Sequence, residues 1–292
     1  MTDDTKKLEN ARRDIDQIDD QLHDLIMARA EKVTDIAAAK ARLSEKGVSG
    51  LRPAREIQVL RRLHARHKGD LPFECLVRIW RELVTGLTMM QGPFSVIVLG
   101  GEGTLKYWDL ARFYYGANTP MSFARTEAQF LEAVSEGEGI VGVLPLAPDS
   151  KEANPWWVRL TGNDGTPRII ARLPLITSGP VTAMHPEAFV LAKGPLEPSG
   201  DDVTLARLKI EGGISRARLE TLLSDAGLMA KDLEVWQGSD TETRDHLISI
   251  EGALGDKALH NALDTINKSV EGAVLEGAII GLVALPLSSE DV

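Results

Sequence analysis

Residues 8–43 read LENARRDIDQIDDQLHDLIMARAEKVTDIAAAKARL and contain neither Gly nor Pro. Apolar residues recur mostly three or four positions apart, which is the period of an amphipathic helix. These positions are Leu8, Ala11, Ile15, Ile18, Leu22, Leu25, Ile26, Val33 and Ile36. At ~1.5 Å per residue, the stretch predicts one helix roughly 50 Å long. Because that is long for a helix of a globular monomer, we expect it to span more than its own subunit.

Three cations on this helix are candidates for binding an anion. Arg29 and Lys40 share nearly the same helix face and lie roughly 16 Å apart along the axis. Arg12 lies about 25 Å from Arg29 and off that face, so it cannot easily serve the same small ligand within one chain. The pattern alone leaves two interpretations open. The cations either clamp a small anion, with Arg12 serving a site in a partner chain, or form a solvated stripe of charge.

Composition narrows the class of protein. The chain has 292 residues and is 43% hydrophobic, enough for two or three domains with buried cores. The net charge of −10 argues against nucleic acid as a partner. Residues 1–92 carry 17 Lys+Arg against 15 Asp+Glu, whereas the remainder carries 16 against 28. The helical part is therefore the region best suited to a small anionic substrate.

Three features indicate a cytoplasmic protein. The first residues, MTDDTKK, do not have the pattern of a signal peptide. The longest apolar run, residues 277–287, is too short to span a membrane. The single cysteine, Cys75, excludes an internal disulfide and fits a reducing compartment.

Two shorter helices are expected after the long one. Pro53 opens the run AREIQVLRRLHARHK, and Pro72 opens FECLVRIWRELVTGLTMMQ. Pro is favoured in the first turn of a helix, and the second run stops at Gln91-Gly92-Pro93. His64 and His67 have no acidic or Cys companions at metal-ligand spacing, so no metal site is expected. Because these helices cannot bury the long apolar stripe alone, we expect a dimer.

The motif set of residues 8–91 resembles that of the all-helical chorismate mutases. The motifs are ARRDID, LIMARA, AAAK, the Arg-Glu pair before IQVLRRL, and IWRELVTGLTMMQ. The resemblance implies an intertwined homodimer with two sites shared between chains. Arg12 then corresponds to the arginine that the partner subunit lends to the site, and Arg29 to the in-chain arginine on a substrate carboxylate. Lys40 and Gln91 correspond to the pair that donates hydrogen bonds to the ether oxygen of chorismate.

The resemblance also implies the rest of the substrate site. Arg55 and Glu56 correspond to groups near the ring hydroxyl. Two departures stand out: GLRPAR replaces an acidic residue often found before the Arg-Glu pair, and Leu87 replaces a small hydroxyl residue, although Thr85 and Thr88 are close. The rearrangement is unimolecular and needs no cofactor, because the site only holds the folded conformer and stabilises charge on the ether oxygen. The expected catalytic residues are Arg12, Arg29, Lys40 and Gln91, and the expected substrate-binding residues are Arg12, Arg29, Lys40, Arg55, Glu56, Leu87 and Gln91.

From Phe94 the sequence has the pattern of an α/β fold. Buried strands SVIVL and IVGVLPL alternate with helix-like KYWDLARFYYG and TEAQFLEAVSEG, and the turn GGEGT does not complete the dinucleotide-binding pattern. The segments LGGEGT and LPLAPD resemble the start of prephenate dehydratases. However, a short connection replaces their second lobe, and residues 186–189 stand where their catalytic Thr-Arg-Phe motif would be. We therefore expect a remnant without dehydratase activity.

The last third alternates strand and helix in the order βαββαβ, which resembles an ACT domain, the regulatory module of dehydratases. Gly212-Gly213-Ile214 stands where such modules use a Gly turn to bind an amino acid, but their Glu-Ser-Arg-Pro segment is not present. Binding of an amino-acid effector and a purely structural or dimerising role both stay open. The expected domains are a helical mutase domain (1–92), a truncated dehydratase-like α/β region (93–182) and an ACT-like module (183–292).

These observations predict a multidomain chorismate mutase of phenylalanine and tyrosine biosynthesis, with an all-α dimeric domain and a non-catalytic α/β region. One alternative is a bifunctional chorismate mutase/prephenate dehydratase, against which the missing lobe argues. The other is a non-catalytic regulatory protein that senses an amino acid. The complete set of Arg12, Arg29, Lys40 and Gln91 argues against the second alternative.

Overall fold

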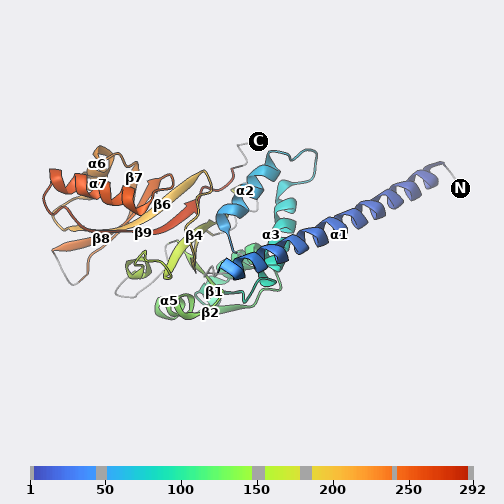
Figure 1. Cartoon of the computed structure of the whole chain (residues 1–292), viewed down its shortest axis with the longest axis horizontal. Helices are drawn as coiled ribbons and strands as arrows, with labels where there is room; N and C mark the ends of the chain where they lie inside the picture. The colour runs from blue at the N-terminus through green and yellow to red at the C-terminus, as the bar shows by residue number, and fades with distance from the viewer. Residues whose placement is uncertain (1–2, 44–50, 147–154, 178–185, 239–241, 289–292) are drawn as a thin grey trace.

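The computed structural model describes residues 3–43, 51–146, 155–177, 186–238 and 242–288, except for the side chains of residues 40–43 and 102. The chain begins with three helices, as predicted (Figure 1). Local signals explain their limits, because Pro53 occupies the first turn of the second helix and the third ends shortly before Gly92-Pro93. The helices are α1 (Asp3–Leu43), α2 (Pro53–His64) and α3 (Phe73–Met89).

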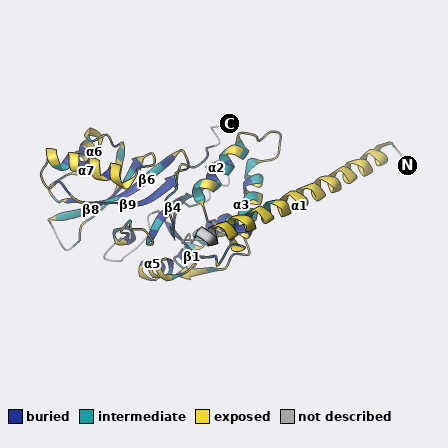
Figure 2. Ribbon diagram, viewed as in Figure 1, coloured by how far each residue is buried: buried dark blue, intermediate teal, exposed yellow. Residues whose placement is uncertain are grey.

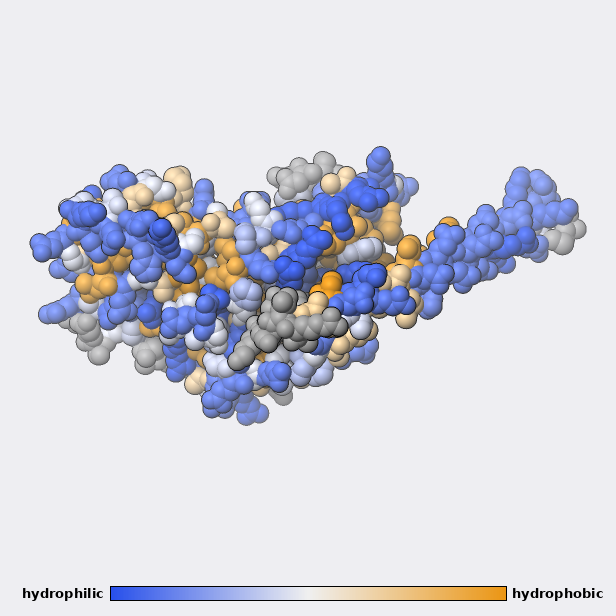
Figure 3. All heavy atoms as spheres, in the orientation of Figure 1, coloured by the Kyte–Doolittle hydropathy of each residue, from blue (hydrophilic) through white to orange (hydrophobic). Residues whose placement is uncertain are grey.

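Helix α1 projects far from the rest of the chain and is exposed along nearly its whole described length (Figures 1 and 2). The face of the rod seen in Figure 3 is largely hydrophilic. Large apolar side chains on α1 nevertheless have 41% to 68% of their surface exposed. They are Leu8, Ile15, Ile18, Leu22, Leu25, Ile26, Met27 and Ile36. One chain alone therefore leaves the apolar stripe of its longest helix in water.

No helix among the described residues is long and apolar enough to cross a membrane.

The remaining chain forms one nine-stranded sheet in the order β2-β1-β3-β5-β4-β9-β6-β8-β7. Its first five strands are β1 (Ser95–Leu99), β2 (Met121–Ala124), β3 (Ile140–Pro145), β4 (Pro167–Leu173) and β5 (Ala188–Lys193). The others are β6 (Asp202–Glu211), β7 (Ala230–Trp236), β8 (Thr243–Glu251) and β9 (Val274–Ala284). Strand β1 pairs in parallel with β2 and β3, and β5 pairs antiparallel with β3 and β4. The short edge strand β2 was not predicted.

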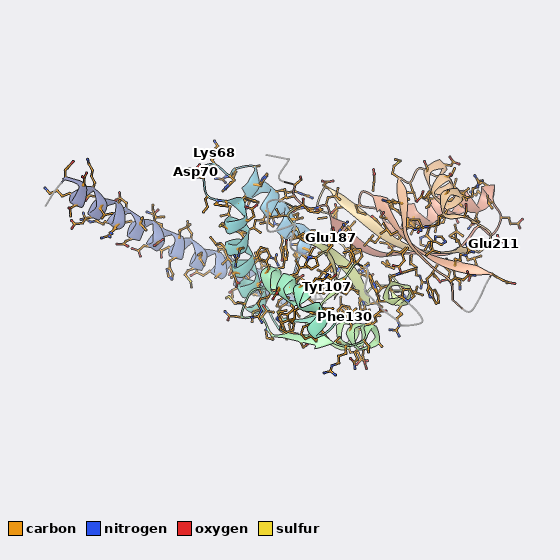
Figure 4. All side chains as sticks on the ribbon, turned by 180° about the vertical axis from the view of Figure 1, so that it is seen from behind. Lys68, Asp70, Tyr107, Phe130, Glu187 and Glu211 are labelled. Carbon is orange, nitrogen blue, oxygen red and sulfur yellow. The ribbon has the colours of Figure 1, made fainter. Side chains whose placement is uncertain are left out.

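Helices cover both faces of the parallel part of the sheet. Val96 and Val98 of β1 pack on the side of α4 (Leu105–Tyr115), while Ile97 and Leu99 pack on the side of α5 (Glu127–Glu136). Phe130 of α5 lies buried under this second face (Figure 4). Burial of both faces explains why β1 reads as a continuous apolar run. The short 3-10 helices η1 (Glu102–Thr104) and η2 (Trp156–Arg159) complete this half.

The last third confirms the predicted βαββαβ order. Its elements follow as β6, α6 (Arg216–Asp225), β7, β8, α7 (Asp256–Ser269) and β9. In the sheet these four strands lie in the order β9-β6-β8-β7, which is the ferredoxin-like arrangement. Both helices share one apolar core with this part of the sheet. The fold class is therefore a long-helix segment followed by an α/β region that ends in an ACT-like module.

Two contacts cross the expected domain limits. Strand β5 lies beyond residue 183, yet it pairs with β3 and β4 rather than with the ACT-like strands. Ile57 of α2 and Val77 of α3 are buried in one core with α4, β1 and β4. The short helices thus bury their apolar faces within their own chain, against the α/β region. The division at residues 92 and 182 stays a prediction.

Tyr114 of α4 provides a test of this shared core. Its hydroxyl accepts a hydrogen bond from the Leu175 backbone N–H at 2.7 Å. We expect Tyr114→Phe to lower the free energy of unfolding by roughly 1–3 kcal/mol, because the buried N–H loses its acceptor. Urea unfolding of both proteins at pH 8 measures this difference.

The same variant should show a distinct pH dependence. Burial raises the pKa of Tyr114 from 10.0 to about 12, although the hydrogen bond from Leu175 and the charge on Arg81 oppose the rise. A raised folded-state pKa contributes stability that is present below pH 10 and is lost as the pH rises toward 12. The wild type should therefore lose roughly 1 kcal/mol of its advantage over Tyr114→Phe between pH 8 and pH 11. An advantage that does not change with pH would contradict this assignment.

Candidate active site

A cavity of about 440 Å³ opens where α1, α2 and α3 meet. This volume is suited to a small organic ligand. All three helices line the cavity, together with Arg52, which precedes α2, and Gln91, which follows α3. Its described lining consists of Arg29, Val33, Ile36, Arg52, Arg55, Glu56, Val59, Leu60, Arg62, Trp80, Arg81, Val84, Leu87, Thr88 and Gln91.

The cavity brings together most of the predicted site residues. Arg29, Arg55, Glu56, Leu87 and Gln91 all line it. Arg29 belongs to α1, Arg55 and Glu56 belong to α2, Leu87 belongs to α3, and Gln91 follows α3. Their convergence therefore depends on tertiary packing.

Two predicted residues are not seen in the cavity. Arg12 is exposed on the projecting part of α1 and is not among the lining residues. Lys40 belongs to α1, but its side chain lies outside the described part of the structure. The roles of both residues stay predictions.

Arg29 carries a charge that no group in the described chain neutralises. Its side chain is half-buried, and Nη1 is buried without a hydrogen-bond partner among the described residues. Burial lowers the pKa of Arg29, but a guanidinium stays charged at neutral pH. A buried charged nitrogen without a partner is costly unless an anion binds it. Arg29 is therefore suited to a carboxylate, which a guanidinium can bind through two parallel hydrogen bonds.

The end of α3 supplies neutral polar groups. Gln91 Nε2 donates a hydrogen bond to the Leu87 carbonyl oxygen at 3.1 Å. The amide carries two hydrogens, so one N–H is left for a ligand. Thr88 also lines the cavity, and its hydroxyl donates to the Val84 carbonyl oxygen at 3.0 Å. A hydroxyl therefore stands one position after Leu87, whereas Thr85 is not part of the lining.

A buried ion pair between Arg81 and Glu56 lines the cavity. Arg81 of α3 donates from Nη1 to Glu56 Oε2 and from Nε to the Tyr114 carbonyl oxygen, the latter at 2.7 Å. The side chains of Arg81 and Glu56 are only 4% and 10% exposed. Burial lowers the pKa of Arg81, but the Glu56 carboxylate and the neighbouring tyrosines raise it more, so the net pKa lies above its ordinary value. The pair holds the carboxylate of Glu56 at the cavity wall.

The cavity has an excess of positive charge. Five arginines line it against the single carboxylate of Glu56. Arg81 pairs with Glu56, and Arg52 pairs with Glu197 at 2.9 Å, from the segment between β5 and β6. The other three, Arg29, Arg55 and Arg62, have no carboxylate partner in the ion pairs of the described chain. Such a site favours a ligand with more than one negative charge.

Four lining residues were not predicted from the sequence as members of the site, namely Arg52, Arg62, Arg81 and Thr88. A signal for Arg81 was present, because it occupies the apolar stripe of α3 between Val77 and Val84, where a charge needs a partner. Arg52 gave no such signal, because its partner lies 145 residues away. In the part of the chain that the structure describes, no three His, Cys, Asp or Glu side chains are grouped as metal ligands would be.

The family match coincides with the helices that form this cavity. Residues 11–91 match the family described as chorismate mutase type II. This segment is a chorismate mutase type II domain. All the lining residues of the cavity fall inside it.

Two bifunctional enzymes are among the known proteins to which this chain is similar. The chain is 30% identical over 152 residues to the bifunctional chorismate mutase/prephenate dehydratase of Pseudomonas aeruginosa. That alignment covers 51% of this chain and 41% of the relative, so the match spans less than half of the relative's length. A relative from Stutzerimonas stutzeri with the same description is 28% identical over 149 residues. That alignment covers 50% of this chain and 40% of the relative.

Two solved structures have a limited similarity in fold to this chain. Prephenate dehydratase from Streptococcus mutans has a TM-score of 0.44 and 11% identity, covering 67% of this chain and all of that chain (100%). GqqA, described as "a novel type of quorum quenching acylases", has a TM-score of 0.47 and 16% identity. The match covers 66% of this chain and 96% of the GqqA chain.

Proposed function

We propose that this protein rearranges chorismate to prephenate in the cavity between α1, α2 and α3, as a step of phenylalanine and tyrosine biosynthesis. The observation that carries the proposal is the coincidence of the family match with a cationic cavity that contains Arg29, Glu56 and Gln91. Chorismate carries two carboxylates, which suits the excess of arginines. The rearrangement of chorismate is unimolecular, so it requires no nucleophile, metal or cofactor.

The residues of the cavity have complementary roles in this proposal. Arg29 binds one carboxylate and holds the folded conformer in which the reacting carbons approach each other. Lys40 and the free N–H of Gln91 donate hydrogen bonds to the ether oxygen as its bond to carbon breaks. Because negative charge develops on that oxygen only during the reaction, these donors stabilise the transition state more than the substrate. Arg55 and Glu56 bind the ring hydroxyl.

The proposed active form is a homodimer. The apolar side chains of α1 are exposed in one chain, and a second copy can cover them. The carboxylate that Arg29 does not bind is then met by Arg12 of the partner subunit. This arrangement accounts for an arginine that lies roughly 25 Å along the helix from Arg29.

The α/β region is proposed to lack prephenate dehydratase activity. It keeps the segments LGGEGT and LPLAPD. The Thr-Arg-Phe motif and the second lobe of prephenate dehydratases are missing from its sequence. Whether the ACT-like module binds an amino acid at the turn of Gly212 and Gly213 stays a prediction. A cytoplasmic location stays part of the proposal as well.

One experiment tests both activities. The purified full chain should consume chorismate and form prephenate, followed spectrophotometrically and identified by chromatography. Supplied with prephenate near pH 8, it should form no phenylpyruvate above the uncatalysed background. Phenylpyruvate formation would favour the bifunctional alternative. Failure to convert chorismate, in a folded protein, would favour the amino-acid-sensing alternative, which a shift in melting temperature with phenylalanine would support.

A further inference from the structure

We propose that Arg81 is a positioning residue of this site, which holds the Glu56 carboxylate so that its second oxygen accepts a hydrogen bond from the substrate hydroxyl. The proposal rests on the proposed function, because it assumes that the ligand is chorismate. Arg81 was given no contact with the substrate in the proposed function. As a positioning residue, it would link the mutase site to the α/β region.

Arg81 is held from several sides. Its Nη1 donates to Glu56 Oε2, and its Nε donates to the Tyr114 carbonyl oxygen at 2.7 Å. The rings of Tyr114 and Tyr115 lie on its guanidinium, each with its centroid 5.7 Å away. Only 3% of the residue's surface is exposed. A planar guanidinium that is fixed by hydrogen bonds and by aromatic rings has few alternative positions.

Glu56 has one oxygen occupied and one free. Its Oε2 accepts from Arg81, while Oε1 is buried with no hydrogen-bond partner among the described residues. A buried carboxylate oxygen without a donor is costly, and native structures usually supply one. Glu56 lines the cavity, so a ligand with a hydroxyl group can supply this donor. Chorismate has such a hydroxyl on its ring.

Arginine suits this task because of its geometry. The guanidinium donates along two directions at once, one toward α2 and one toward α4. A lysine ammonium is a point charge that can face the carboxylate but cannot reproduce the planar fork. The orientation of Glu56 is thereby set by the backbone of α4, which follows the mutase segment in the sequence.

A neighbouring residue offers a matched control. Glu82 Oε1 accepts from the Ala117 backbone N–H at 3.2 Å, so Glu82 also joins α3 to the end of α4. Glu82 is not among the described residues that line the cavity. Glu82→Gln therefore weakens the same junction of helices without changing the carboxylate in the site.

The test is a double-mutant cycle between Arg81→Lys and Glu56→Gln in the full-length protein. Each single variant should lower kcat/KM for chorismate by about 10- to 100-fold, the usual effect of disturbing a hydrogen bond to a charged group. The double variant should be no worse than Glu56→Gln alone, because Arg81 acts through that carboxylate. Glu82→Gln should stay within about two-fold of the wild type.

A second measurement uses a chorismate analogue whose ring hydroxyl is methylated. The wild type should prefer chorismate, and this preference should shrink in Arg81→Lys as it does in Glu56→Gln. Losses that multiply in the double variant, or a preference that survives in Arg81→Lys, would overturn the proposal while leaving the mutase function intact. If Arg81→Lys and Arg81→Gln both failed to fold while Glu82→Gln folded, Arg81 would be a structural residue and the proposal would also fail. An inactive wild type would instead refute the proposed function.

Discussion

Arg12→Ala and Arg29→Ala should each lower kcat/KM for chorismate by roughly 1,000-fold or more in the homodimer. Each variant removes the cation that faces one substrate carboxylate, and losing one partner of a buried charge pair costs about 2–5 kcal/mol or more. Arg29 is half-buried at the cavity and Arg12 is exposed far along α1. A similar loss from two such distant positions is expected only if both serve one site.

Co-expression of the two variants with different tags separates a shared site from a site within one chain. In a heterodimer, one site takes Arg29 from the first chain and Arg12 from the second, and both are wild type there. The other site loses both arginines. Purified heterodimers should therefore recover about half of the wild-type activity. Arg13→Ala changes the neighbouring exposed cation and should have little effect. No recovery in verified heterodimers would place the whole site in one chain.

Lys40→Ala should lower kcat by roughly 100- to 1,000-fold, with a smaller change in KM. The proposed partner of Lys40 is the ether oxygen, whose charge develops mainly in the transition state, so the loss should appear in kcat. Steady-state kinetics over a range of chorismate concentrations measures both constants. Circular dichroism before the assay shows that the variant is folded.

Lys32→Ala is the matched control for Lys40→Ala. Lys32 lies on the same helix, and its ammonium is exposed and pairs with Asp35 at 3.1 Å. Removing such a surface pair usually changes little. If Lys40→Ala kept activity within a few-fold of the wild type, the ether oxygen would have another donor, and Gln91 would be the first residue to test.

The α/β region packs against the helices that form the candidate site. Ile57 and Val77 are buried in a core that includes Tyr114 of α4, and Arg81 reaches the backbone of the same residue. Arg61 of α2 donates to the Ser199 and Leu285 carbonyl oxygens at 3.2 and 3.1 Å. The helices that form the cavity are therefore held by residues from the rest of the chain. A protein cut after residue 92 would expose this core, so its stability is expected to fall.

Much of the fold was readable from local patterns. The absence of Gly and Pro over residues 8–43 predicted one long helix, and Pro53 and Pro72 marked the next two. The βαββαβ order of the last third followed from alternating strand and helix patterns. Arg29, Glu56 and Gln91 were assigned by resemblance, and the structure places all three in one cavity. Their roles stay predictions, as do those of Arg12 and Lys40.

The sequence by itself was enough for the helices, because a helix is built from hydrogen bonds between residues four apart and from the residues at its ends. The folded chain was needed for the partners of Glu56 and Arg52, which lie 25 and 145 residues away. It was also needed to place β5 beside β3 and to bury α2 and α3 against α4. Such pairs depend on how whole elements pack, and no local spacing records that packing. The charge of Arg81 in an apolar stripe indicated that a partner was needed, but only packing could select Glu56.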